Sequence, residues 1–532
     1  MALDRTRRSR REVLKSSGAA SVLAAAPAML AEPQAAEAAV PQLPVLTGLE
    51  PDNLFTRIGV RSLINARGTY TIISGSRSLP EVKRAMFEAS HYYVQMDEMM
   101  EGIGAQLGRL TGAEWGIATN GAEAAICLAT IACIAGANVE KCQALPFVKG
   151  RDQVIVPRHS RNPYDVGVRM VGAEIIEVET AEELQARFSP RTAMIYVMSG
   201  PPAASGPLSI ANLCAFGKAH NIPVLVDAAA EEPLNPNIHL AAGATLVCYS
   251  GGKCLRGPQS SGMLIGDKNL CQAAYYQAAP HHCYGRALKC SKEESMGLLA
   301  AVEQWYRRDH TAEQAMWRSW LGTIENRLKP LASTRFEYLE PADLSNRAPQ
   351  LRVHWDAAKL GITGSELVAR LDAGTPRILV GGGTGQRPDR MASSLTIMPY
   401  MMDPGEDRIV ADAIFSILSN PGRHDNPVVP GGAPASLVGN WAMTVQYLRG
   451  QGEQKLILSQ DGNDIAGTHQ GEIYAGAVTG SVHGDRVEIA SRMVVPGNGI
   501  NWTFKGTVDG NRMGGSVNMG EYGDATWTAT RA

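Results

Sequence analysis

The stretch that decides the fold reads VLVDAAAEEP from Val224 to Pro233 and continues, after a short connection, as LVCYSGGKCLRGPQSSGMLIG from Leu246 to Gly266. Its two apolar runs, at 224–226 and 246–249, have the length and β-branched content of parallel strands that are buried on both faces. Asp227 ends the first strand, and Lys253 follows the second. In open α/β sheets, ligands bind outside the carboxyl ends of the strands. We therefore expect the acid and the amine at one ligand-binding edge.

The pair of charges at this edge suits pyridoxal phosphate (PLP) chemistry. A lysine can form a Schiff base with the aldehyde, while an acid keeps the pyridine nitrogen protonated so that the ring accepts electrons. Gly251-Gly252 would let the backbone approach the cofactor closely. Taken singly, Asp227 could be only a helix cap and Lys253 only a solvated loop residue.

A phosphate site is predicted upstream, where the strand-like run Trp115-Gly116-Ile117-Ala118 breaks into an alanine-rich helix. The turn Thr119-Asn120-Gly121-Ala122 places free backbone N–H groups and the positive end of a helix at one point, which favours an anion. The alternative is an ordinary capped helix. His159, just past the predicted strand at 153–156, falls on the same edge and could stack on a flat ring or be a solvated loop histidine.

Composition narrows the functional classes. The chain has 532 residues and is 45% hydrophobic, which supports a large core divided into two or three domains. A net charge of −2 gives no reason to expect nucleic-acid binding. The nine cysteines are scattered without a C-x-x-C pair, so neither a disulfide framework nor a metal site is expected.

The N-terminus, residues 1–44, is predicted to be a targeting segment and linker. Ser9-Arg10-Arg11-Glu12-Val13-Leu14-Lys15 resembles a twin-arginine signal and precedes a small, apolar stretch. Such a signal implies the twin-arginine export machinery as a partner and a periplasmic or secreted location. No other run is long and apolar enough to span a membrane.

The remaining chain is predicted to form three folded units. Residues 45–330 alternate strands and helices, which favours a mostly parallel sheet; within them, a helix is expected from Pro80 to about Met100 and another from Gly102 to Thr111. Residues 331–425 read as a smaller α+β domain. After a linker at 426–434, residues 435–532 alternate in short strands separated by turns such as Asp461-Gly462-Asn463, which predicts an antiparallel barrel or sandwich.

With these residues in place, the chain resembles fold type I PLP-dependent enzymes, in the branch that contains bacterial selenocysteine synthase and the sugar-acid ammonia-lyases. The similarity extends from about Asn65 to Glu294, while the signal and the C-terminal β-domain lie outside it. The matching stretches are LINARGTYT, GRLTGAEWGIATNGAEAAI, VLVDAAAEEP, YSGGKCLRGPQSSGMLIG and YGRALKCSKEE.

The resemblance implies a role for each matching residue. Lys253 would bind the cofactor covalently and carry the proton, and Asp227 would hold the pyridinium. The resemblance further assigns the phosphate to Asn120, Gly121, Ala122 and Ser250, and the ring face to His159. It places Arg256 against the phosphate or the substrate, and makes Arg67 and Arg377 substrate candidates. Arg377 is followed by the glycine run 381–385, a departure from the family pattern. The family also implies a homodimer or larger homo-oligomer.

The expected activity is a β-elimination that releases ammonia from an amino acid or amino sugar acid after α-proton abstraction. A racemase or an aminotransferase shares the first steps and stays open as an alternative. Selenocysteine synthesis is not expected, because it needs a charged tRNA, and neither the export signal nor the near-neutral charge suits that partner. The contrasting class is an exported binding or structural protein that keeps only the fold.

Overall fold

The computed structural model describes residues 48, 50, 52–428 and 431–532. The predicted twin-arginine signal therefore lies outside the described residues, and so does part of the predicted linker at 426–434. Within the described part of the chain, no helix is long and apolar enough to cross a membrane.

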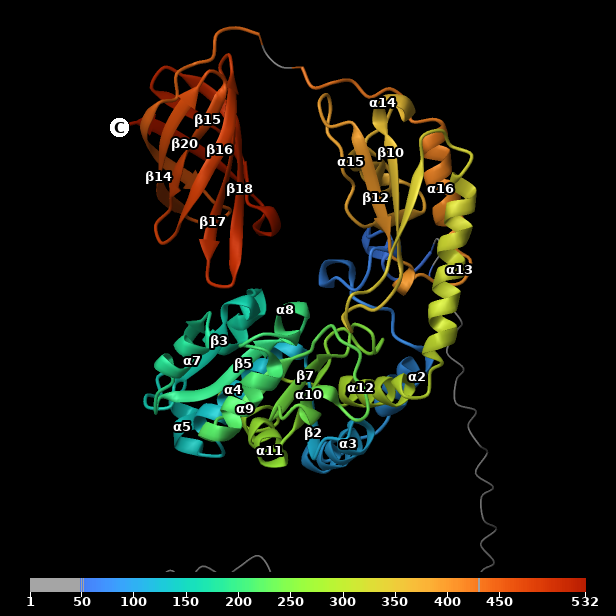
Figure 1. The fold of residues 1–532 in the computed structure, drawn as a ribbon, viewed down its shortest axis with the longest axis vertical. Helices are drawn as coiled ribbons and strands as arrows, with labels where there is room; N and C mark the ends of the chain where they lie inside the picture. The colour runs from blue at the N-terminus through green and yellow to red at the C-terminus, as the bar shows by residue number, and fades with distance from the viewer. Residues whose placement is uncertain (1–47, 49, 51, 429–430) are drawn as a thin grey trace, which may run out of the picture. The chain divides into compact units, whose positions relative to one another are not determined.

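A seven-stranded sheet organises the large domain (Figure 1). All neighbouring strands pair in parallel except β8, which runs antiparallel to both of its neighbours. The predicted mostly parallel sheet is thus confirmed. Its strands, in spatial order, are β2 (Trp115–Thr119), β8 (Gly262–Gly266), β7 (Leu246–Ser250), β6 (Val224–Asp227), β5 (Thr192–Met198), β3 (Gln153–Pro157) and β4 (Glu174–Val178).

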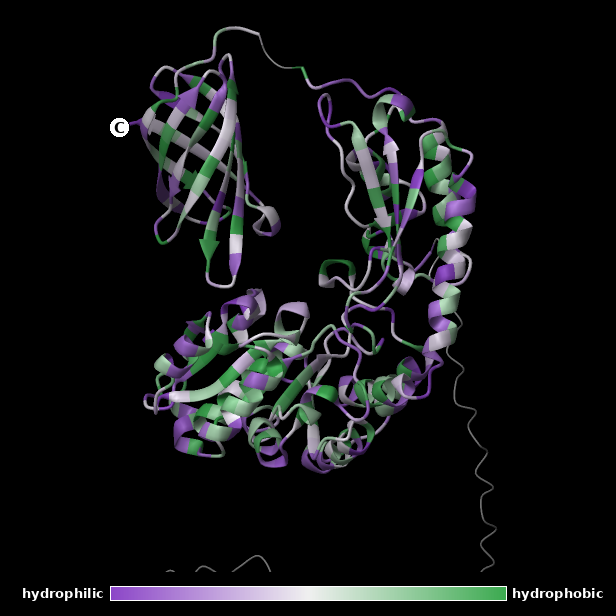
Figure 2. Cartoon of the chain, viewed as in Figure 1, coloured by the Kyte–Doolittle hydropathy of each residue, from purple (hydrophilic) through white to green (hydrophobic). Residues whose placement is uncertain are grey.

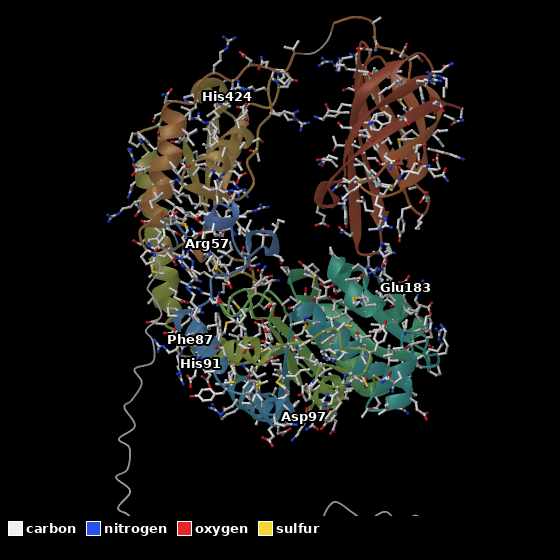
Figure 3. The ribbon with its side chains drawn as sticks, turned by 180° about the vertical axis from the view of Figure 1, so that it is seen from behind. Arg57, Phe87, His91, Asp97, Glu183 and His424 are labelled. Carbon is white, nitrogen blue, oxygen red and sulfur yellow. The ribbon has the colours of Figure 1, made fainter. Side chains whose placement is uncertain are left out.

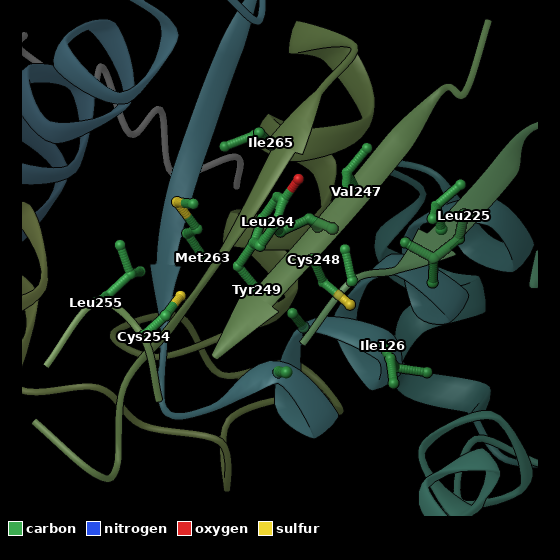
Figure 4. Close-up of a cluster of buried hydrophobic side chains, with 14 of the residues drawn as sticks. Ile126, Leu225, Val247, Cys248, Tyr249, Cys254, Leu255, Met263, Leu264 and Ile265 are labelled. Carbon is green, nitrogen blue, oxygen red and sulfur yellow. The ribbon is translucent and has the colours of Figure 1, made fainter. Parts of the chain in front are cut away.

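The core of this domain is the sheet together with helix α4 (Ala122–Ala135), which contacts β5, β6, β7 and β8. Every residue of α4 except Glu123 is buried, as expected for a helix that is apolar all round. Figure 4 shows side chains of β6, β7 and β8 packed with Ile126 of α4, and Figure 2 shows these elements as hydrophobic. Every residue of β6, β7 and β8 except Ser250 is buried, which explains the apolar runs in their sequences.

The other helices of the large domain surround this core (Figure 1). Their bounds are α2 (Pro80–Ala89), α3 (Met96–Thr111), α5 (Val139–Ala144), α6 (Val166–Arg169), α7 (Ala181–Arg187), α8 (Pro201–Ala204), α9 (Ile210–His220), α10 (Ile238–Ala241), α11 (Lys268–Gln277) and α12 (Lys292–Trp305). Single-turn 3-10 helices are η1 (Thr56–Ile58), η2 (Thr71–Ile73), η3 (Arg158–Ser160) and η4 (Pro163–Asp165).

The helix predicted from Pro80 to Met100 is wrong in its extent, because the chain leaves the helix after Ala89 and begins a new one at Met96. His91 Nδ1 lies 2.8 Å from the Phe87 carbonyl oxygen at the end of α2, and the Gln95 side chain accepts the Glu98 N–H at 2.7 Å to start α3. Figure 3 labels Phe87, His91 and Asp97 on either side of the break. These local caps override the apolar spacing.

The small domain has a three-stranded antiparallel sheet with β10 (Gln350–Asp356) between β9 (Arg335–Leu339) and β12 (Ala392–Ile397). Strand β11 (Arg377–Val380) instead pairs in parallel with β1 (Leu63–Ala66), so an N-terminal strand joins this domain. One hydrophobic core runs through the large and small domains. The remaining elements are α13 (His310–Leu328), α14 (Ala357–Leu360), α15 (Gly364–Ala373), α16 (Glu406–Ser419) and η5 (Pro399–Met401).

The C-terminal domain is a closed eight-stranded antiparallel barrel with its own hydrophobic core. Buried and exposed residues alternate along its strands, which places one face of each strand inside. The predicted barrel-or-sandwich domain is therefore a barrel. Its elements are β13 (Gly439–Gln446), β14 (Gln451–Asp461), β15 (Asp464–Gln470), β16 (Ala475–His483), β17 (Arg486–Val495), β18 (Asn498–Asp509), β19 (Arg512–Asn518), η6 (Gly520–Tyr522) and β20 (Asp524–Arg531).

Candidate active site

Asp227 occupies the carboxyl end of β6 and is 5% exposed. Three donors face its carboxylate: the Tyr196 hydroxyl at 2.8 Å, the Ala229 N–H at 3.1 Å and the Cys248 thiol at 3.6 Å. Burial and the charge of Asp227 hold the pKa of Tyr196 well above its ordinary value, so the phenol remains a donor. These donors fix the position of the carboxylate, which can then pair with a protonated ring nitrogen.

Lys253 lies in the turn that follows β7, and its neighbours Cys254 and Leu255 are buried (Figure 4). Burial lowers the pKa of Lys253, and the nearby charge of Asp227 opposes this effect. Among the described residues, no hydrogen bond or ion pair engages its Nζ. A partly buried amine that loses its proton readily is suited to act as a nucleophile and as a base.

The glycines before Lys253 are required by close packing rather than by left-handed backbone angles. A Cβ on Gly251 would lie 2.0 Å from Ser261 Oγ, and one on Gly252 would lie 2.8 Å from Gln259 Cα. These distances are far shorter than van der Waals contact, so larger residues would displace the turn at 251–255 that carries Lys253, called the lysine turn below.

The predicted phosphate turn joins β2 to α4. The N-terminus of α4 has no side-chain cap, because its N-cap residue is Gly121 with φ 134°. The buried Asn120 Oδ1 has no hydrogen-bond partner among the described residues. A Cβ on Gly262 would lie 2.6 Å from the Gly121 carbonyl carbon, so β8 approaches this turn as closely as a glycine permits. The uncapped N–H groups and the unpartnered amide fit a phosphate group.

Ser250 lies on the same edge as the phosphate turn. Thr119 of β2 and Ser250 of β7 both pair with Gly262 of the strand between them. Adjacent strands are about 4.8 Å apart, so the ends of β2 and β7 are separated by roughly 10 Å across β8. Topology thus brings Asn120 and Ser250 together, although 130 positions separate them in the chain.

His159 lies on η3, just past the carboxyl end of β3, and is exposed. Its Nε2 is 3.3 Å from the Leu208 carbonyl oxygen and its Nδ1 is 3.1 Å from Ser160 Oγ. These two contacts set the orientation of the ring at the edge where Asp227 ends its own strand, two strands away in the sheet.

The three predicted substrate arginines occupy different places. Arg256 has a left-handed φ of 55° and donates from Nε to the Arg77 carbonyl at 3.0 Å, and burial followed by the charge of Arg308 lowers its pKa. Arg67 is exposed at the end of β1, above the Tyr70 ring.

The fold does not place Arg377 beside Arg67. It pairs with Leu63 at the opposite end of the two-stranded sheet, and its Nε donates to Asp372 at 2.6 Å. Its guanidinium therefore already has a carboxylate partner, which leaves Arg256 and Arg67 as the stronger candidates for contact with substrate.

Sequence reasoning missed Tyr196 and Asn162. Tyr196 reads as one more apolar residue of a buried strand, yet its hydroxyl binds Asp227 and accepts a hydrogen bond from Asn162 Nδ2 at 3.1 Å. Its sequence signal is a hydroxyl in the middle of a run of apolar residues, Ala193 to Met198.

Comparison with known proteins independently supports the resemblance to PLP-dependent enzymes. No protein-family model matches the chain. It is 29% identical over 339 residues to D-glucosaminate-6-phosphate ammonia lyase of Salmonella typhimurium, covering 60% of this chain and 87% of that protein. It is 28% identical over 343 residues to 5'-C-glycyluridine monooxygenase-decarboxylase of a Streptomyces species, covering 61% and 83%. A shorter match, 32% over 133 residues, is to L-seryl-tRNA(Sec) selenium transferase of Edwardsiella ictaluri, covering 23% and 26%.

The solved structure of D-glucosaminate-6-phosphate ammonia-lyase superimposes with a TM-score of 0.59 at 27% identity, covering 69% of this chain and 99% of that one. The fold is that of the type I PLP-dependent enzymes. The resemblance seen in the motifs is thereby confirmed. In a fold type I enzyme, PLP would be held by the residues described above, and their unpartnered amide, uncapped helix end and buried acid fit its phosphate and ring nitrogen.

Proposed function

We propose that the protein is a PLP-dependent lyase that releases ammonia from a small amino acid or amino sugar acid. The observation that supports this most directly is one sheet edge that holds Asp227, with three donors on its carboxylate, and Lys253, with a lowered pKa. The similarity to an ammonia lyase in sequence and fold favours elimination over the alternative reactions.

The residues of this sheet edge have separate roles in the proposed reaction. PLP, when bound, supplies an electron sink for the carbanion that forms at the substrate α-carbon. Asp227, whose carboxylate is held in place by three donors, would pair with the protonated ring nitrogen. The Lys253 amine takes the α-proton at Nζ, for which its lowered pKa prepares it. Asn120, the start of α4 and Ser250 hold the phosphate.

The substrate would be bound on the open side of this edge. Arg256 and Arg67 are the candidates for its carboxylate, and His159 is the candidate for contact with the ring face. The most similar relatives include an enzyme named for a phosphorylated sugar acid. For an exported protein we propose an unphosphorylated amino acid or amino sugar acid, because phosphorylated sugars are intracellular metabolites.

We further propose that the twin-arginine signal directs the protein to the periplasm or out of the cell. The support is the Arg10-Arg11 motif and the small, apolar stretch that follows it. Expression with Arg10 and Arg11 both replaced by Lys should leave the protein in the cytoplasm, whereas the native chain should appear in the periplasmic fraction. Equal fractionation of the two forms would contradict export by this route.

A homodimer or larger homo-oligomer is the proposed assembly. The N-terminal part of the described chain exposes several large apolar side chains, which favours burial in a subunit interface; these are Leu54, Phe55, Ile58, Ile72, Tyr92 and Tyr93. Light scattering coupled to size-exclusion chromatography should give a mass of at least twice that of one chain of the purified form, which is 56.8 kDa for the full sequence. A monomeric mass would contradict the assembly.

The central experiment adds PLP to the purified protein, removes unbound PLP by gel filtration and records the visible absorbance that the protein retains. We expect a band in the wild type and in Lys268→Ala, an exposed-lysine control, and none in Lys253→Ala. The protein is then incubated with amino acids and amino sugar acids, and ammonia and keto acid should appear together. A wild type that stays colourless with PLP would refute the proposed function.

Two other outcomes would identify a different reaction. Interconversion of D and L amino acids without ammonia would indicate a racemase, and amino transfer to a keto acid would indicate an aminotransferase. The 28% identity to a monooxygenase-decarboxylase favours a further candidate, an oxygen-dependent decarboxylation. Consumption of O₂ with release of CO₂ and no keto acid would support that candidate in place of the lyase.

A further inference from the structure

Glu231 lies four residues beyond Asp227 and is 5% exposed. Its Oε1 accepts a hydrogen bond from the Ser199 hydroxyl at 2.5 Å, and its Oε2 is 2.6 Å from His239 Nε2, whose side chain is also buried. Both carboxylate oxygens are therefore engaged by short contacts. A buried carboxylate is stable only with such partners, so the three side chains form one unit.

This unit is connected to both of the reactive residues. Ser199 directly follows β5, and its N–H donates to the Asp227 carbonyl at 2.9 Å. On the other side, the Glu231 carbonyl accepts the Cys254 thiol at 3.2 Å, and Cys254 is the residue after Lys253. Glu231 thus joins the backbone at Asp227 to the lysine turn.

The next residue, Glu232, provides a contrast. Its carboxylate is 3.3 Å from Arg347 Nη1, and its N–H donates to the Leu344 carbonyl at 3.1 Å. Burial raises the pKa of Glu232, and Arg347 opposes this. Among the described residues, Glu232 makes no hydrogen bond to Ser199, His239 or the lysine turn, so adjacent acids have separate connections.

We propose that Glu231 is a positioning residue that fixes the separation between Asp227 and Lys253 through Ser199 and Cys254. The inference rests on the proposed function, because this separation matters only if the two residues bind one cofactor. The Ser199 hydroxyl donates its proton to Glu231. Ser199 is half-exposed, so its hydroxyl oxygen is left as a hydrogen-bond acceptor at the sheet edge that holds Asp227. Ser199 and His239 are members of the same positioning unit.

The test compares Glu231→Ala, Glu231→Gln and the control Glu232→Gln in the full chain. Two readouts are independent of turnover: PLP affinity by equilibrium titration, and the pH midpoint of the visible absorbance of the loaded protein. We expect Glu231→Ala to weaken PLP binding by about tenfold and to move the midpoint by about half a pH unit or more. Glu231→Gln keeps an oxygen for Ser199, so its changes should be smaller. Glu232→Gln should stay within about twofold of wild type.

A purely structural role would lower the melting temperature of Glu231→Ala but leave its absorbance midpoint and PLP affinity at the wild-type values, and this result would overturn the inference. If Glu231→Ala does not fold, the same comparison is made with Glu231→Gln and Ser199→Ala, and unchanged midpoints in both would overturn it equally. A wild type that binds no PLP would refute the proposed function and the inference together, whereas a coloured wild type with unchanged variants would refute the inference alone.

Discussion

Replacing Tyr196 by Phe tests how the acid at the centre of the site is held. The Tyr196 hydroxyl is buried, donates to Asp227 at 2.8 Å and accepts from Asn162 at 3.1 Å. Without it, Asp227 keeps only the Ala229 N–H and the Cys248 thiol, while Asn162 Nδ2 still donates to the Ser160 carbonyl at 2.7 Å. The main loss is one buried hydrogen bond to a charged group.

Hydrogen bonds to charged groups contribute about 1.5–3 kcal/mol. Tyr196→Phe should therefore lower the free energy of unfolding of the cofactor-free protein by about 2 kcal/mol. PLP binding should also weaken, by roughly fivefold or about 1 kcal/mol, because the Asp227 carboxylate is less firmly held in position. Urea unfolding and equilibrium titration with PLP measure the two quantities.

Tyr249→Phe is the matched control. Tyr249 is equally buried on β7, which lies on the other side of β6 from β5. Its hydroxyl oxygen accepts from the neutral Asn237 amide at 2.7 Å and makes no hydrogen bond to Asp227. The control should lose about 1 kcal/mol of stability and keep wild-type PLP affinity. If both variants lose equal stability and neither changes PLP affinity, the assignment of Tyr196 as the support of Asp227 is refuted.

Three further predictions concern single residues. Asn120→Ala should leave the stability of the cofactor-free protein within about 0.5 kcal/mol of wild type, since Asn120 Oδ1 has no hydrogen-bond partner to lose. The same substitution should weaken PLP binding, and an unchanged PLP titration would contradict the phosphate site. Because the pKa of Lys253 is lowered in the folded protein, the unfolded chain binds more protons between the folded pKa and 10.5, and stability rises with pH in that window. Cofactor-free Lys253→Met should therefore be more stable than wild type at pH 7. Urea unfolding should show that the difference shrinks as pH approaches 10.5. Burial lowers the pKa of His469 in the barrel from 6.5 to about 4. The free energy of unfolding of the barrel should therefore fall by about 3 kcal/mol as pH falls from 6.5 to 4. Tryptophan fluorescence follows the unfolding transition, and His469→Gln should abolish its pH dependence; equal pH dependence in both forms would contradict the prediction.

The surroundings of His469 explain why the barrel is expected to lose stability when this histidine is protonated. His469 is fully buried, with Nε2 2.7 Å from Gln454 Oε1 and Nδ1 3.0 Å from Ser491 Oγ. Both ring nitrogens are engaged by neutral groups, and no described acid pairs with the ring. Protonation therefore places an unpaired charge inside the barrel.

The sequence by itself determined the elements whose signals are local. Continuous apolar runs identified β6 and β7, and period-two alternation with Asp-Gly-Asn turns identified the antiparallel C-terminal domain. The Asn120-Gly121 turn before an alanine-rich stretch was readable because a helix start is encoded by adjacent residues. Asp227 and Lys253 could be placed at one edge because parallel strands end on the same side of a sheet.

Only the tertiary structure decided which distant groups meet. Strand β1 pairs with β11 across more than 300 positions, which places Arg67 and Arg377 at opposite ends of one sheet. Tyr196 and Glu231 look like a strand residue and a loop acid in sequence, yet one supports Asp227 and the other joins it to the lysine turn. Such contacts depend on strand order and side-chain direction. Neither is encoded by neighbouring residues, because long-range pairing is set by how the whole core packs.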